Sequence, residues 1–167
     1  MPVTTSINPA PLPPILVVED SAEDFTALSR AFRKYALRYP VLRCEDGDQA
    51  LEYLQGGGKH TGWPKVLPAI VLLDLNLPGT DGRTVLQLLK QDPALHTIPI
   101  IIFTTSANAR DVSECYRSGA NSYLTKPLEY AALEDKVRLI VRYWLEDRKS
   151  TRLNSSHSTL SRMPSSA

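Results

Sequence analysis

The chain has 167 residues and a formal net charge of +1, and 43% of its residues are hydrophobic and 22% are charged. These proportions are ordinary for one folded domain, and they exclude a disordered chain and a strongly basic nucleic-acid-binding protein. No apolar run is long enough to cross a membrane and the N-terminus lacks a signal-peptide pattern, so we expect a cytoplasmic protein that binds neither nucleic acid nor membrane.

The two ends of the chain differ in composition from the rest. Residues 1–14 are rich in Pro, which predicts a flexible leader. Residues 147–167 are rich in Ser without apolar periodicity, as in a disordered tail. A sharper hypothesis is that they are not native, because residues 147–157 and 161–167 match the translation of a common short-read sequencing adapter. The tail holds four basic residues and one acidic residue, so without it the net charge becomes −2. Genomic DNA encoding the same tail would contradict this hypothesis.

The first half of the chain alternates short apolar runs with helical patterns. Residues 15–18 form a β-branched run that predicts a strand, and Glu19, Asp20 and Ser21 follow it. Ser21 is a suitable N-cap for a helix whose apolar residues recur at helical spacing to Tyr35. A short strand over residues 41–44 and a helix over 47–54 follow. Residues 56–68 predict a long loop that begins with a Gly triplet. The loop is not expected to bind phosphate, because the Lys-Ser/Thr pair of a phosphate-binding loop does not follow the triplet.

The second half continues the alternation. Residues 69–73 are an unbroken apolar run that ends at Asp74 and a Pro-Gly turn, which predicts a strand buried on both faces. The other predicted strands are 98–103, which runs into Thr104, and 122–125, which runs into Lys126. The predicted helices of this half span residues 82–91, 108–117 and 128–145.

Five strands alternating with helices predict an α/β fold with a doubly wound, mostly parallel sheet and helices on both faces. The carboxyl ends of parallel strands share one edge, so we expect the residues that follow them to converge there. These residues are Glu19, Asp20, Asp74, Thr104 and Lys126.

This set of side chains is suited to phosphoryl transfer. Three clustered carboxylates repel one another and therefore call for a cation, and Mg²⁺ prefers carboxylates, waters and phosphate oxygens. Asp74 is then a candidate nucleophile for an acyl phosphate, and Lys126 would offset the charge of the phosphoryl group. Cys44 and Cys115 lack metal-ligand spacing and are expected to be free thiols that are buried or half-buried.

The same residues, together with Asn76, the Asp81-Gly82 pair and Pro127, resemble the receiver domain of two-component response regulators. The resemblance covers about residues 15–145, so we expect a receiver domain over 15–146. It implies a flavodoxin-like five-stranded sheet in the order 2-1-3-4-5. It implies that Asp74 is the phosphoacceptor, that Asp20 and Asp74 bind Mg²⁺ directly, and that Glu19 acts through water. It further assigns Asn76 as a backbone carbonyl ligand, Lys126 and Thr104 as phosphoryl-binding groups, and Tyr123 as a switch residue that moves inward on activation.

The resemblance is greatest to the small single-domain regulators paired with bacterial phytochrome histidine kinases. It implies a signalling protein rather than an enzyme, which receives its phosphoryl group from a sensor histidine kinase and switches a partner-binding face. It also implies a homodimer through the fourth helix, fifth strand and fifth helix. Tyr143 and Trp144 either contribute to that contact or close the core.

Two other functions remain open at this stage. An aspartyl-phosphate hydrolase of the haloacid dehalogenase type also uses an Asp after an apolar strand, but Asn76 replaces the second Asp of its Asp-x-Asp motif. A phosphorylation-independent adaptor that only retains the fold is the other alternative, and the complete set of acidic, hydroxyl and ammonium groups argues against it.

Overall fold

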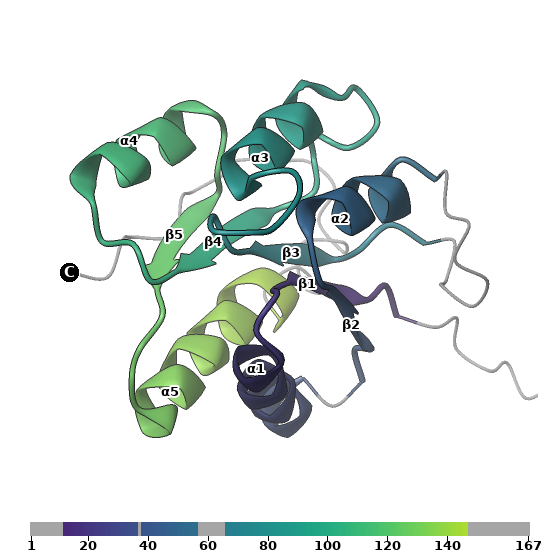
Figure 1. The fold of residues 1–167 in the computed structure, drawn as a ribbon. Coiled ribbons are helices and arrows are strands. Elements are labelled where there is room, and N and C mark those ends of the chain that lie inside the picture. Colours follow the sequence, from purple (N-terminus) through teal and green to yellow (C-terminus); the bar gives the residue numbers. More distant parts are fainter. Residues whose placement is uncertain (1–11, 37, 57–65, 147–167) are drawn as a thin grey trace, which may run out of the picture.

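The computed structural model describes residues 12–36, 38–56 and 66–146. They contain five parallel strands in the order β2-β1-β3-β4-β5 (Figure 1). The strands are β1 (Ile15–Val18), β2 (Val41–Cys44), β3 (Ile70–Leu73), β4 (Ile100–Thr104) and β5 (Ser122–Thr125). The predicted doubly wound sheet and its strand order are therefore confirmed. The predicted leader and tail lie outside the described residues, as does most of the predicted long loop.

Helices connect successive strands. They are α1 (Ala22–Tyr35), α2 (Gly47–Leu54), α3 (Gly82–Gln91), α4 (Ala109–Arg117) and α5 (Tyr130–Ile140), which continues as the π-helix η1 (Val141–Glu146). The side chain at each of the first four N-caps accepts a hydrogen bond from the following turn: Ser21, Asp46, Asp81 and Asn108. These caps satisfy backbone N–H groups that the helices leave free, so short polar residues mark where each helix begins.

The helices cover both faces of the sheet, with α2, α3 and α4 on one face and α1 and α5 on the other (Figure 1). Alternate strand residues therefore enter two separate cores: Leu16 and Val71 pack with α2 and α3, whereas Val17 and Leu72 pack with α1 and α5. Burial on both faces explains why β1, β3 and β4 are continuous apolar runs. Both cysteines are free and buried, as predicted.

Two predicted elements begin two residues too early, and the other starts and ends that were predicted for strands agree with the structure to within one residue. The fourth strand begins at Ile100 rather than Ile98, because Pro99 has no N–H for the ladder and the Ile98 N–H donates to Leu95 O instead. The last helix begins at Tyr130 rather than Leu128, and its final turns have π geometry. Trp144 is buried there among the core residues beneath α1 and α5, and within the described residues its Nε1 has no partner. No helix among the described residues is long and apolar enough to span a membrane.

Candidate functional site

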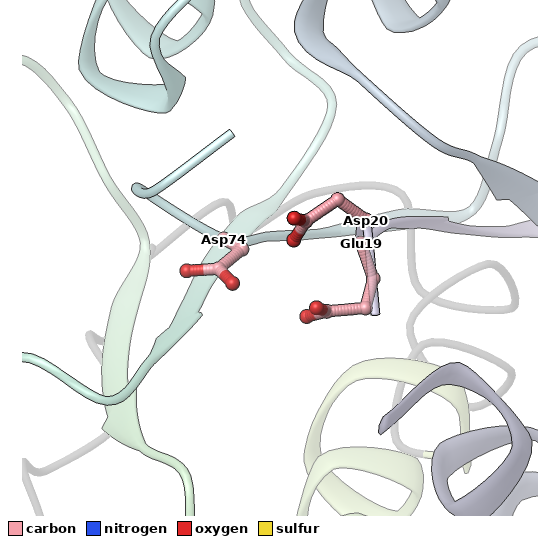
Figure 2. A group of neighbouring side chains, drawn as sticks. All are labelled: Glu19, Asp20 and Asp74. Carbon is pink, nitrogen blue, oxygen red and sulfur yellow. The ribbon is translucent and has the colours of Figure 1, made fainter. Parts of the chain in front are cut away.

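Three carboxylates meet at the carboxyl edge of the sheet. Glu19 and Asp20 follow β1, Asp74 follows β3, and one oxygen of each lies within 4.8 Å of the others. Figure 2 shows Glu19 and Asp20 projecting toward Asp74. The parallel pairing of β1 with β3 extends to the site, since the Asp74 N–H donates to Val18 O at 3.1 Å. The ladder therefore fixes the backbone from which all three acids project.

Lys126 reaches the acids from β5, two strands away from β3. Its backbone N–H donates to Thr104 O at 2.8 Å, which aligns the end of β5 with the end of β4. Its Nζ lies 2.8 Å from Asp74 Oδ2 and 2.6 Å from Glu19 Oε2. Burial disfavours the charged lysine, but hydrogen bonds to its carboxylate partners outweigh burial and raise the Lys126 pKa above its usual value. Lys126 is therefore a fixed ammonium beside the candidate nucleophile.

The members of the acid pair have different surroundings. Glu19 is 1% exposed, and both of its oxygens are engaged, Oε2 with Lys126 and Oε1 with the Ser21 N–H at 3.1 Å. Burial raises the pKa of Glu19 to about 7, although Lys126 opposes this shift. Asp20 is exposed. A cation at this edge would thus find an exposed carboxylate on Asp20, whereas Glu19 and Asp74 are buried and each has both oxygens engaged within the protein.

Thr104 ends β4 beside this cluster. Its side chain is fully buried, and its Oγ1 has no hydrogen-bond partner among the described residues. A buried hydroxyl without a partner costs free energy, and an incoming phosphoryl oxygen is an acceptor that would satisfy it. The orphan hydroxyl of Thr104 and the three clustered carboxylates, of which Asp20 is exposed, fit a site for a hard cation such as Mg²⁺ together with a phosphoryl group.

The loop after Asp74 is held by close backbone contacts. The Asn76 N–H donates to Asp74 Oδ1 at 3.3 Å, and the Gly82 N–H donates to Leu75 O at 3.0 Å. Gly82 lies so close to the Asp74 carbonyl that a Cβ there would overlap it. From the neighbouring helix α2, Asp48 accepts a hydrogen bond from the Thr80 hydroxyl. These contacts hold the loop that carries Asn76, whose carbonyl is the predicted metal ligand.

Tyr123 lies on β5 and connects to the loop before α4. Its side chain is buried, and its hydroxyl donates to Ser106 O at 2.8 Å. Ser106 Oγ in turn donates to Asp111 Oδ2 at 2.6 Å, and Arg83 Nη2 donates to Asp111 Oδ1 at 2.8 Å. The predicted switch residue thus has its ring already inside this structure, at one end of a polar chain that ends on α3.

Sequence reasoning missed one acid of the site. Asp24 lies in the first turn of α1, and its Oδ2 is 2.9 Å from Lys126 Nζ. The available signal was a carboxylate four residues after Asp20, which is one helical turn beyond the strand end. The Arg83–Asp111–Ser106 connection was also missed, because it joins separate helices and a loop.

The sequence and the fold are both similar to those of known signalling regulators. Residues 15–138 match the family described as the response regulator receiver domain. The probable methanogenesis regulatory protein FilR2 of Methanothrix harundinacea is 39% identical over 78% of this chain and 83% of its own length. The response regulator Rcp1 of Synechocystis is 39% identical over 79% of this chain and 88% of its own length.

Two solved structures resemble this fold closely. The phosphorylated cyanobacterial phytochrome response regulator RcpA aligns with a TM-score of 0.76 at 34% identity, over 81% of this chain and 96% of that one. The Mn²⁺-bound form of Rcp1 aligns with a TM-score of 0.74 at 38% identity, over 80% of this chain and 95% of that one. The residues matched by the family model, 15–138, include all five strands and the acidic edge described above.

Proposed function

Because this chain belongs to the response regulator receiver family of two-component signalling proteins, we propose that it accepts a phosphoryl group on Asp74 from a sensor histidine kinase, with Mg²⁺ as cofactor. The observation that carries the proposal is the contact of Lys126 with Asp74 beside Glu19 and Asp20. A nucleophilic carboxylate, open acidic oxygens for a cation and a fixed ammonium are the parts that phosphoryl transfer requires.

In the proposed transfer, an Asp74 oxygen attacks the phosphorus of the kinase phosphohistidine. The new O–P bond forms as the P–N bond breaks, and the electron pair of that bond returns to the imidazole nitrogen. Bound Mg²⁺ would neutralise charge on the phosphoryl oxygens, with Asp20, Asp74 and the Asn76 carbonyl as its protein ligands and Glu19 acting through water. Lys126 donates to a phosphoryl oxygen, and the Thr104 hydroxyl gains the acceptor that it lacks. Slow loss of the phosphoryl group to water would reset the site.

The proposed output is a change at the face formed by α4, β5 and α5. Movement of Thr104 toward the phosphoryl group would alter the loop that contains Ser106, and Tyr123 donates its hydrogen bond to that loop. Tyr123 would then report the state of Asp74 to the face next to α4, which is the candidate surface for a homodimer. Trp144 belongs to the core, so of the C-terminal aromatic pair only Tyr143, which is partly exposed, is available to that surface.

The proposed kinase is of the phytochrome type. Support comes from the similarity to RcpA, which is named as a phytochrome response regulator. FilR2, a methanogenesis regulatory protein, is 39% identical to this chain, so the test of the kinase includes kinases of other types. Phosphotransfer from a panel of purified, phosphorylated histidine kinases would identify it by the fastest transfer.

Phosphorylation with a small phosphodonor tests the proposal directly. With acetyl phosphate and Mg²⁺ the chain should gain one phosphoryl group, measured by intact mass, because the donor bypasses the need for a kinase. Asp74→Asn should abolish the gain, and chelation of Mg²⁺ should suppress it. Asp135→Asn is the matched control, because Asp135 is exposed on α5 and pairs with Arg138, outside the site. Continued acid-labile phosphorylation of Asp74→Asn would contradict the role of Asp74.

A further inference from the structure

We propose that Asp24 is a positioning residue for phosphorylation: it holds Lys126 in the unphosphorylated protein and is the partner that Lys126 releases when a phosphoryl group arrives. The inference rests on the proposed function of Asp74. It concerns a residue on α1, outside the strand ends that supply the rest of the site.

The Lys126 ammonium group is surrounded by three carboxylates. Its Nζ lies 2.6 Å from Glu19 Oε2, 2.8 Å from Asp74 Oδ2 and 2.9 Å from Asp24 Oδ2. An ammonium group has three N–H donors and no more. Lys126 can therefore donate to a phosphoryl oxygen only after one of the three carboxylates has given up its contact.

Exposure identifies the carboxylate that leaves. The Asp24 side chain is 46% exposed, whereas that of Glu19 is 2% exposed. Water can replace Lys126 as the partner of Asp24, but a released Glu19 would be a buried charge without its cation, which is strongly unfavourable. Asp74 stays beside Lys126 because it carries the phosphoryl group, so Asp24 is the exposed partner that can turn to water.

Asp24 is held in reach of Lys126 by its own helix. Its backbone N–H donates to the N-cap hydroxyl of Ser21 at 3.2 Å. Glu19, one of the acids of the site, lies two residues before Ser21. The first turn of α1 is thus attached to the strand end that carries the acid pair. This attachment makes Asp24 a fixed competitor for the ammonium rather than a remote surface charge.

Two effects of Asp24 oppose the phosphoryl group. Its carboxylate competes for one Lys126 donor, and its negative charge repels the added phosphoryl charge. Removing the side chain should therefore favour the phosphoryl-bound state. Partly exposed ion pairs are weak, so the expected gain in affinity is about two- to fivefold.

Beryllium fluoride, which mimics a phosphoryl group on a carboxylate, is a suitable probe. Its apparent dissociation constant for the full chain would be measured by ¹⁹F NMR in the presence of Mg²⁺. Asp24→Ala should bind about two- to fivefold more tightly than the wild type. Asp24→Asn should show a smaller gain of the same sign, because its amide oxygen still accepts from Lys126, and this variant decides the matter if Asp24→Ala does not fold.

Glu23→Ala is the matched control. Glu23 is an acid in the same first turn of α1 and is exposed, and it is not among the carboxylates that contact Lys126. It should leave the dissociation constant unchanged. An equal gain in affinity in Glu23→Ala would show that removing any nearby negative charge has the same effect, and it would overturn the inference. Unchanged or weaker binding in both Asp24 variants would also overturn it. Mere damage to the fold would weaken binding, so a gain distinguishes positioning from a structural role.

The same titration separates this inference from the proposed function. If the wild type does not bind beryllium fluoride, or if Asp74→Asn binds it equally well, the proposed function fails and the inference fails with it. If the wild type binds at Asp74 and the Asp24 variants match it, only the role of Asp24 is refuted.

Discussion

Asp20 contributes repulsion to the site as long as no cation is bound, because its carboxylate oxygen lies within 4.8 Å of those of Glu19 and Asp74. Among the described residues, Lys126 is the only cation in contact with the carboxylate oxygens of this cluster. Like charges about 4 Å apart repel by about 1 kcal/mol in water and by more when partly buried. Asp20→Asn should therefore raise the free energy of unfolding of the metal-free protein by about 0.5–1 kcal/mol, measured by urea denaturation with a chelator.

The advantage of Asp20→Asn should disappear in excess Mg²⁺. Under that condition the wild type gains the free energy of metal binding, whereas the variant has lost a proposed ligand. Asp135→Asn, at an exposed carboxylate of α5, should change stability little in either condition. A loss of stability in metal-free Asp20→Asn would contradict this account of the acidic cluster.

Lys90 should give the free energy of unfolding a pH dependence that is separate from that of the acidic cluster. Its Nζ donates to His96 O, Ile98 O and Asn121 Oδ1 at 2.9–3.0 Å, and none of these partners is charged. Burial lowers the pKa of Lys90 to about 8, below its usual 10.5. Between pH 8 and pH 10.5 the Lys90 amine is protonated in the unfolded chain but mostly neutral in the folded protein. Lys90 therefore makes the free energy of unfolding rise with pH from about 8 to 10.5, and this contribution is lost as the pH falls through 8.

Lys90→Met isolates this contribution. The stability of the wild type relative to Lys90→Met should increase by about 1–3 kcal/mol between pH 7.5 and 10, measured by urea denaturation, because each pKa unit corresponds to about 1.4 kcal/mol. The three oxygen acceptors favour the ammonium form, which places the expected value toward the lower end of this range. A pH-independent difference would show that Lys90 stays charged in the folded protein throughout.

At the residue scale, the sequence was sufficient to predict which side chains meet at the site wherever those side chains directly follow a strand. Asp74 and Lys126 were predicted to meet because parallel strands end at one edge, and their side chains do lie in contact. Asp24 was missed because its contact joins the first turn of α1 to Lys126, which follows β5 about a hundred residues later. Such a contact between elements distant in sequence leaves no local pattern.

At the element scale, the first residue of α3, Gly82, packs directly against the backbone of Asp74. A Cβ at Gly82 would overlap the Asp74 carbonyl and lie 2.7 Å from Leu75 Cα. Since backbone atoms cannot move aside as side chains do, Gly82→Ala should lower the free energy of unfolding by about 2–3 kcal/mol and weaken phosphorylation of Asp74. Thermal unfolding and acetyl phosphate labelling would measure the two effects.

Gly56→Ala provides the control for Gly82→Ala. Gly56 has a φ of +74°, and nothing lies within 4 Å of a Cβ added there. Its replacement should cost only about 1 kcal/mol of backbone strain and leave phosphorylation unchanged. Equal losses in both variants would indicate that the overlap at Asp74 is relieved by a small shift of α3.

Element positions were well predicted, and element ends less so. The strands β1, β2 and β5 and the helix α3 match their predicted bounds, because polar caps and turn residues delimit them. The start of β4 was placed too early because hydrophobicity alone does not register the missing N–H of Pro99. The π-helix η1 has no sequence signature, since its geometry reflects how Trp144 and Leu145 reach the core.

At the scale of the whole molecule, alternation of strands and helices predicted the two-faced architecture. Five strands and the helices between them require crossovers, and these place α1 and α5 on one face and the other helices on the opposite face (Figure 1). The strand order itself came from the family resemblance rather than from the alternation. The leader, most of the long loop and the adapter hypothesis fall outside the described residues, so those expectations stay predictions.

Lys126 is delivered by β5, late in the chain, while its carboxylate partners come from its first half. A polypeptide still emerging from the ribosome therefore displays Asp74 long before the ammonium group that should make it reactive. Under the proposed chemistry, unfinished translation products would be poor phosphoryl acceptors. They would therefore not compete with the completed regulator for phosphoryl groups from the kinase.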